Sequence, residues 1–189
     1  MKIFVLLGHT DVDTLSGALA DRYQEAATKA GHTVRRLNIG DMSFDPVLHR
    51  GYKEIQELEP DLKTFSKNIH WADHIVIVYP TWWCSMPALL KGLFDRAWLP
   101  HDVFRFADHG LTWAKLLKGR TARIITCANM NPWILRFMYG SPTVVLELVI
   151  LRFAGVRARS TVFGPSERAS EAAKQRWLRK VARLAQKGR

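Results

Sequence analysis

The chain has 189 residues, of which 48% are hydrophobic and 24% charged, and a formal net charge of +11 at pH 7. Such a composition is that of an ordinary globular protein, and the length allows one domain with a full core, so we expect residues 1–189 to form a single domain. Two cysteines, Cys84 and Cys127, are too few for a disulfide framework and lack metal-ligand spacing. We expect free thiols in a reducing compartment, with a disulfide between them left open, and no metal site.

The amino-terminal segment and the longest apolar run both argue against insertion in a membrane. Residues 1–8 are only briefly apolar and lack a small-residue cleavage site, so we interpret them as a first strand rather than a signal peptide. The apolar run at residues 144–154 is interrupted by Glu147 and Arg152 and is too short to span a bilayer. We therefore expect a cytoplasmic protein.

Five short apolar runs, several of them rich in Val and Ile, predict strands that are covered on both faces. They lie at residues 2–7, 33–37, 74–79, 121–127 and 157–163. Helical patterns follow or precede them at about residues 14–30, 60–71, 87–98, 143–153 and 169–186. Because strand and helix alternate, we predict an α/β fold: a doubly wound, five-stranded parallel sheet with helices on both faces.

The loop after the first predicted strand, residues 8–17, has features of a phosphate site. It holds Thr14 and Ser16 at a helix start, where backbone N–H groups lack intrahelical partners and the helix dipole favours an anion. It lacks the motifs of nucleotide triphosphate loops and of dinucleotide folds, which excludes both. Asp11 and Asp13 would repel a phosphate, so we expect at least one of them to cap the helix; the alternative is that Asp13 and Thr14 act only as caps.

The loop after the third predicted strand carries the strongest signal for a ligand. Pro80 ends the strand, Trp82 and Trp83 fill the turn, and Pro87 opens the next helix. Open α/β sheets bind ligands at the carboxyl ends of their strands, and two indoles without a charge suit a flat aromatic ligand such as a flavin ring. The alternative is that both indoles are packing residues, although two neighbouring aromatics cannot easily both face the core from one turn.

The segment after the fourth predicted strand, residues 126–133, brings small and polar residues to a strand end, where a backbone can approach a ligand closely. In a sheet with the order 2-1-3-4-5, the ends of strands one, three and four lie side by side at the topological switch point. The three loops therefore predict one common crevice.

These motifs resemble those of the flavodoxin-fold NAD(P)H:quinone oxidoreductases. The most specific match is P-x-W-W-x-x-M-P-A-L-L-K-G-x-x-D-R at residues 80–96. Asp45-Pro46 matches a second signature of that family, and Gly8-His9 with residues 13–16 is similar to its flavin phosphate loop. The resemblance covers nearly the whole chain and implies a flavodoxin-like fold with the strand order 2-1-3-4-5.

The resemblance also implies a function: two-electron hydride transfer from NADPH or NADH, through a bound flavin, to a planar acceptor such as a quinone, an azo compound or a nitro compound. FMN is the expected flavin, with FAD left open, and the protein is expected to be a homodimer with the flavin near the interface. The residues expected to bind the flavin are His9, Thr14, Leu15, Ser16, Pro80, Thr81, Trp82, Trp83, Cys84, Ala128 and Asn129. Within this set, Trp82 and Trp83 would form a stacking wall, and the backbone N–H groups of residues 81–84 would stabilise the reduced ring.

The chain departs from the family pattern at residues 128–133, which lack a Gly-Gly turn, so no catalytic tyrosine or histidine is carried over. Two other functions stay open. One is an ancillary subunit of a membrane transporter, and the other is a flavin-free binding module. The basic terminal helix, within residues 168–189, is interpreted as a solvated face; the alternative is docking on an acidic partner, an anionic membrane surface or, least expected, a nucleic acid.

Overall fold

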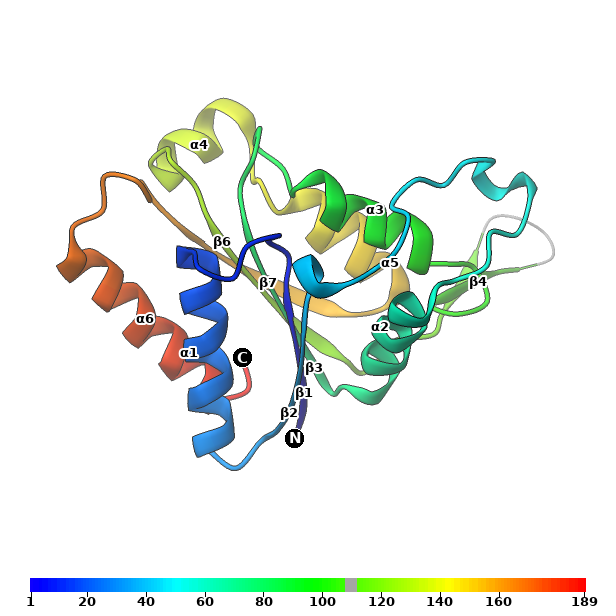
Figure 1. The fold of residues 1–189 in the computed structure, drawn as a ribbon, viewed down its shortest axis with the longest axis horizontal. Coiled ribbons are helices and arrows are strands. Elements are labelled where there is room, and N and C mark those ends of the chain that lie inside the picture. Colours follow the sequence, from blue (N-terminus) through cyan, green and yellow to red (C-terminus); the bar gives the residue numbers. More distant parts are fainter. Residues whose placement is uncertain (108–111) are drawn as a thin grey trace.

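The computed structural model describes residues 1–107 and 112–189 and confirms the predicted parallel sheet. Its five strands lie in the order β2-β1-β3-β6-β7, which is the expected order 2-1-3-4-5 (Figure 1). Each strand agrees with its predicted apolar run to within one residue. The strands are β1 (Lys2–Leu7), β2 (Thr33–Asn38), β3 (His74–Pro80), β6 (Thr121–Cys127) and β7 (Arg157–Phe163).

Helices cover both faces of the sheet, as expected for a doubly wound fold (Figure 1). One face carries α1 (Leu15–Lys29) and α6 (Glu171–Gln186). The other carries α2 (Pro60–Trp71), α3 (Ala88–Ala97) and the π-helix η3 (Val145–Leu151), which continues into α5 (Arg152–Ala154). The helix predicted at residues 143–153 is thus correct in position, but most of it is a π-helix.

Several smaller elements were not predicted. They are helix α4 (Pro132–Tyr139), the antiparallel pair β4 (Phe104–Phe106) and β5 (Trp113–Lys115), and the 3₁₀ turns η1 (Ile39–Asp41) and η2 (Gly51–Lys53). None of the helices in the described residues is long and apolar enough to cross a membrane.

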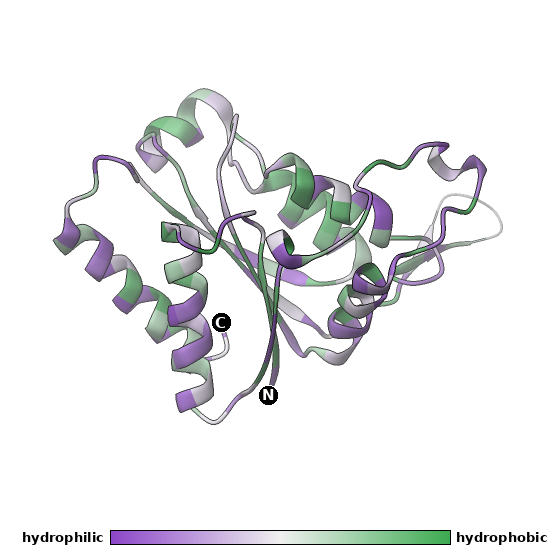
Figure 2. Ribbon diagram, in the orientation of Figure 1, coloured by the Kyte–Doolittle hydropathy of each residue, from purple (hydrophilic) through white to green (hydrophobic). Residues whose placement is uncertain are grey.

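Two hydrophobic clusters form the core, one on each face of the sheet. On β3, Ile75 and Ile77 pack with the cluster under α2 and α3, whereas Val76 and Val78 pack with the cluster under α1 and α6. This alternation explains why the strand is apolar at successive positions. Along α6, hydrophilic residues alternate with hydrophobic ones (Figure 2), so the helix turns one side to the core and its basic side to solvent.

Helix α3 is fixed against the segment that holds Asp45-Pro46. Gly92 permits close approach, since a Cβ atom there would lie 2.5 Å from the Cβ atom of Pro46. Arg96 is fully buried and donates hydrogen bonds to the carbonyl oxygens of Asp45 and Glu57. It also forms an ion pair with Glu59, with 2.9 Å between Nη2 and Oε2. These contacts join the Asp45-Pro46 signature to Gly92 and Arg96, which both belong to the motif at residues 80–96. They also fix the position of α3, the helix that follows the loop with Trp82 and Trp83.

Candidate functional site

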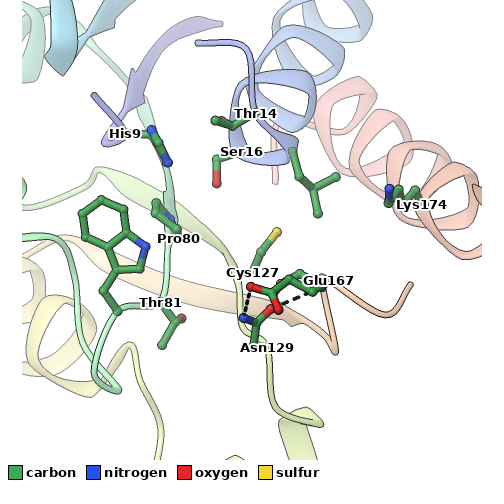
Figure 3. Close-up of a pocket in the computed structure, with 12 residues that line it drawn as sticks. His9, Thr14, Ser16, Pro80, Thr81, Cys127, Asn129, Glu167 and Lys174 are labelled. Atoms are coloured by element: carbon green, nitrogen blue, oxygen red, sulfur yellow. Dashed lines mark hydrogen bonds between the residues drawn. The ribbon is translucent and has the colours of Figure 1, made fainter. Parts of the chain in front are cut away.

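A cavity of about 400 Å³ opens at the carboxyl ends of β1, β3 and β6, next to the first turn of α1 (Figure 3). It is called the crevice below. Eight of the eleven predicted flavin-binding residues line it: His9, Thr14, Leu15, Ser16, Pro80, Thr81, Trp82 and Asn129. The three loops singled out from the sequence therefore meet at one site. Trp83, Cys84 and Ala128 are not among its lining residues.

The first turn of α1 forms one end of the crevice. Thr14 caps the helix, because its side chain accepts a hydrogen bond from the Gly17 N–H at 3.2 Å. Leu15 and Ser16 follow, and their N–H groups have no acceptor among the hydrogen bonds of the described residues. Since Ser16 is only 3% exposed, these donors face the crevice in a sheltered position. Such a turn fits a phosphate group.

The expectation that Asp11 or Asp13 caps α1 is wrong. The Asp11 carboxylate instead accepts a hydrogen bond from the Asp13 N–H at 2.8 Å, which closes a local turn before the helix. Both aspartates are exposed, and neither lines the crevice. The physical reason is the fold of the loop: a Cβ atom on Gly17 would lie 1.9 Å from the Val12 carbonyl oxygen, so the loop lies directly on the helix and leaves capping to Thr14.

The tryptophan loop forms the opposite side of the crevice. Trp82 and Ser85 exchange backbone hydrogen bonds at 3.0 and 2.9 Å, which makes Trp83 and Cys84 the centre of a two-residue turn. Both central residues have positive φ angles, 49° and 59°, as the tight turns of hairpins require. The turn directs Trp82 toward the crevice, edge to face with His9 at 5.5 Å between ring centroids. Trp83 is fully exposed, so the alternative of two buried packing indoles is wrong.

The backbone donors of this loop are fewer than expected. The Thr81 N–H donates to the Cys127 carbonyl oxygen at 2.7 Å, and the Trp82 N–H is engaged in the turn. The prediction that all of residues 81–84 offer N–H groups to a ligand is therefore wrong for Thr81 and Trp82. Trp83 and Cys84 keep N–H groups without an acceptor among the described residues. The Thr81 hydroxyl is held by the Thr126 hydroxyl at 2.7 Å, which fixes this wall to the neighbouring strand.

The third wall joins the segments after β6 and β7. The Asn129 amide group donates to the Glu167 carboxylate, and its side-chain oxygen accepts from the Ser166 hydroxyl at 2.8 Å and from the Glu167 N–H at 3.2 Å (Figure 3). The Ala128 carbonyl oxygen accepts from the Ser166 N–H at 2.9 Å. Ala128 is buried, so it supports the wall from behind while Asn129 forms its surface.

Three lining residues were missed in the sequence analysis: Ser166, Glu167 and Lys174. Cys127 also lines the crevice; it lies in the predicted segment 126–133 but was not among the residues expected to bind the flavin. Ser166 and Glu167 follow β7, whose carboxyl end lies at the same edge of the sheet, so the predicted strand order could have found them. Lys174 comes from α6, and Figure 3 shows its side chain directed toward the start of α1. It adds a positive charge at the end of the crevice that holds the free N–H groups.

None of the side chains that line the crevice is an obvious catalytic group. Burial raises the pKa of the Cys127 thiol to about 12, so this cysteine is an inert thiol at neutral pH. Cys127 and Cys84 are both free, as expected. No group of three or more potential metal ligands occurs in residues 1–107 and 112–189. The site offers shape, hydrogen-bond donors and an indole, and so it suits a bound ring system that carries its own reactivity.

Exposed apolar side chains, called the apolar surface below, occur on α4 and on η3, and the first of them lies four residues after Asn129. They are Trp133, Ile134, Phe137, Met138, Leu148 and Val149. Trp133 is 80% exposed and Phe137 92% exposed. A concentration of exposed aromatic and aliphatic groups of this kind marks an interaction surface in a folded protein.

Comparison with known proteins shows the family and the fold of the chain. Residues 1–184 match the family model described as the flavodoxin-like fold. The uncharacterized NAD(P)H oxidoreductase YcaK of Escherichia coli K12 is 32% identical over 133 residues, which cover 62% of this chain and 65% of that protein. The chain thus spans less than two thirds of the length of this relative.

Two solved structures share the fold over nearly their whole length. The NAD(P)H:quinone oxidoreductase from Methanothermobacter marburgensis has a TM-score of 0.82 at 20% identity, with 98% of each chain covered. An FMN-dependent NADH-azoreductase from Bacillus anthracis, solved in complex with FMN, has a TM-score of 0.69 at 18% identity, with 98% of each chain covered.

Proposed function

Because the chain belongs to the flavodoxin-like fold family, we propose that it is a flavin-dependent NAD(P)H oxidoreductase that passes two electrons, as a hydride, to a planar quinone-like acceptor. The observation that carries the proposal is the meeting of three loops in one crevice, with free N–H groups at one end and an indole at the other. The names of the relatives, NAD(P)H oxidoreductase and NAD(P)H:quinone oxidoreductase, support it. The protein acts, in this proposal, in the cytoplasm and as one domain.

The residues of the crevice fit FMN. The N–H groups of Leu15 and Ser16, the Ser16 hydroxyl and the Lys174 ammonium group would hold the phosphate. Pro80, Thr81 and Trp82 would lie beside the ring system, and a volume of about 400 Å³ is within the range of cofactor sites. A bound flavin supplies the hydride chemistry itself.

The side chains around the ring would then orient the two planar reactants and exclude water. Trp82 presents a flat indole that is about half exposed, and its contact with His9 restricts its rotation. The N–H groups of Trp83 and Cys84 have no acceptor among the described residues, and in this proposal they would donate to negative charge that develops on the ring. The hydrogen bonds of Asn129 to Ser166 and Glu167 keep the third wall rigid.

A second copy of the chain is the proposed occupant of the apolar surface on α4 and η3. The exposed aromatic residues Trp133 and Phe137 are typical anchors of protein interfaces. Because α4 begins directly after the Asn129 segment, a dimer through this face would bring a partner subunit close to the crevice. The homodimer expected from the resemblance is therefore proposed with this face as its interface.

The visible absorption spectrum of the purified protein, after incubation with FMN or FAD and desalting, tests the proposal. We expect retained flavin bands, FMN on mass analysis of the released cofactor, and bleaching by NADPH or NADH without oxygen. Protein that retains neither flavin and oxidises neither NADPH nor NADH would contradict the proposal and favour a flavin-free binding module.

Two variants with the same loss of charge sharpen this test. Lys174→Met should weaken FMN binding about tenfold, which corresponds to 1.4 kcal/mol, but should leave the binding of riboflavin, which has no phosphate, unchanged. Arg179→Met is the control, since Arg179 is an exposed residue of the same helix that does not line the crevice. Equal loss of FMN and riboflavin affinity in Lys174→Met would contradict the assignment of the phosphate end.

A further inference from the structure

A second cavity, of about 600 Å³, lies at the opposite end of the sheet from the crevice. It is lined by the first residues of β3, β6 and β7 and by the chain after α6, and it is called the arginine cavity below. Figure 1 shows the carboxyl terminus at this end of the molecule, away from α4. Of the described side chains that line the cavity, five are arginines and none is acidic. The arginines are Arg123, Arg152, Arg157, Arg159 and Arg189.

The register of the sheet brings two of these arginines together. Arg123 on β6 pairs with Arg159 on β7, and the two strands are parallel, so both side chains project from the same face. Two positions before them, toward the edge of the cavity, Thr121 pairs in the same way with Arg157. Like charges opposite each other destabilise a sheet unless an anion lies between them.

Arg123 is the least expected member of this set. Only 8% of the residue is exposed, and its single hydrogen bond to a side chain, from Nη1 to the Thr161 hydroxyl, is long at 3.5 Å. Its Nε atom is buried and has no partner among the described residues. Arg123 also takes part in none of the ion pairs in the described part of the chain. The charge of Glu147 acts on Arg123 from a distance, but the two form no ion pair among the described residues. A buried guanidinium group without a directly paired carboxylate is costly unless another anion satisfies it.

His74 lines the same cavity and shows the same deficit. It is 1% exposed, its Nδ1 atom shares a hydrogen bond of 2.7 Å with the Thr121 hydroxyl, and its buried Nε2 atom has no partner among the described residues. Burial, together with the charge of Arg123 and the proximity of His32, lowers the pKa of His74 to about 4. The cavity thus contains a buried cation and a buried imidazole, each with an unused polar atom.

We propose that the arginine cavity binds the phosphate groups of a small phosphorylated molecule. Guanidinium groups match phosphate in geometry and charge, and several of them on one wall suit a ligand with more than one negative charge. The volume exceeds what a single phosphate needs and falls in the range of small-molecule sites. None of the lining residues is shared with the crevice, so this site is separate from the proposed flavin site.

Calorimetric titration of the protein with inorganic pyrophosphate, at constant ionic strength, measures the binding affinity and so tests the proposal. Arg123→Met removes the buried cation and should weaken binding at least tenfold. Arg179→Met, on the solvent side of α6, removes the same charge elsewhere and should bind pyrophosphate as the unmodified protein does. Absence of binding at millimolar concentrations, or a loss that follows Lys174→Met in place of Arg123→Met, would overturn the proposal. Sulfate that binds as tightly as pyrophosphate would also overturn it.

Two further measurements guard against a variant that fails to fold. Arg159→Met changes an exposed residue at the edge of the cavity and should weaken pyrophosphate binding severalfold. The NMR signals of the His74 ring in the unmodified protein report directly from inside the cavity. Bound pyrophosphate should raise the pKa of His74, because an anion favours the protonated ring. Unchanged titration of His74 at saturating pyrophosphate would contradict the assignment of the ligand to this cavity.

Discussion

Replacement of Arg96 by leucine should destabilise the protein strongly without touching the crevice. The side chain of Arg96 is 0% exposed and is the donor for two backbone carbonyl groups and for the Glu59 carboxylate. Leucine fills part of the same volume but donates no hydrogen bond. The two carbonyl oxygens, of Asp45 and Glu57, and the carboxylate then lose their partner together.

The magnitude follows from what remains buried. Removal of one partner of a buried ion pair costs about 3–5 kcal/mol. The Glu59 side chain is 29% exposed, so water can hydrate its carboxylate once Arg96 is replaced. This favours the lower end of that range, about 3 kcal/mol. A chain of this size loses about 2–4 °C in Tm for each kcal/mol, so Tm should fall by about 6–12 °C.

Thermal and urea unfolding of both proteins measures this effect, with Arg50→Leu as the control. Arg50 pairs with Glu54 on the surface, at 69% and 61% exposure, and its loss should change the free energy of unfolding by less than about 0.5 kcal/mol. A loss below about 1 kcal/mol for Arg96→Leu would refute the reasoning, since the buried donors would then contribute little.

The pH dependence offers a second check on the same ion pair. Burial raises the pKa of Glu59, but the hydrogen bonds and charge of Arg96 outweigh it, and the pKa is lowered from the ordinary value of 4.5. A carboxyl group with a lowered pKa stabilises the fold above its unfolded pKa, and this contribution disappears as the pH falls through the folded pKa. The difference between Arg96→Leu and the unmodified protein should therefore narrow below about pH 4.5. A difference that is constant with pH would contradict the role of the charge.

Three other predictions concern the two cavities. Gly17→Ala would place a Cβ atom 1.9 Å from the Val12 carbonyl oxygen, so the loop must move. FMN should then bind at least about tenfold more weakly, and an unchanged affinity in a fluorescence titration would contradict this. Alkylation at pH 8 should label Cys84 and spare Cys127, because burial raises the pKa of Cys127 to about 12, and mass analysis that finds both labelled would refute it. The pKa of His74 is lowered from 6.5 to about 4, so in phosphate-free buffer the protein should lose up to about 3 kcal/mol of stability as the pH falls from 6.5 to 4. His74→Asn should lack this slope in urea unfolding.

The strands could be predicted because burial on both faces leaves a direct trace in the sequence. β3 is apolar at every position from Ile75 to Val78. An amphipathic helix does not require four successive apolar residues, so this run favours a strand. Helix η3 was harder to foresee. Its fully buried residues, Leu146 and Leu151, are five positions apart, which matches the i→i+5 period of a π-helix and not the period used to identify an α-helix.

Helix α4 was missed because its apolar residues do not form a buried stripe. Leu135 alone is buried, whereas Trp133 and Phe137 are exposed, so most of the apolar residues of this short helix do not face the core. Pro132 at its first position was a usable signal of a helix start.

The candidate site was predictable where one loop carries several matched residues, as at Pro80, Thr81 and Trp82. Lys174 could not be found in that way. It is one of many basic residues on α6, and only the packing of α6 beside α1 distinguishes it from those that face solvent.

The turn at Trp83 and Cys84 has a consequence for any attempt to engineer this protein. Residues other than glycine and asparagine at positive φ store about 1–2 kcal/mol each, and here two such residues are adjacent. A redesign guided by stability alone would choose Asn-Gly, the pair that this turn type favours. It would gain thermal resistance while deleting the fully exposed indole of Trp83. A library varied at these two positions would therefore show whether the exposed indole is needed for turnover or whether the strain of the turn can be removed without loss of activity.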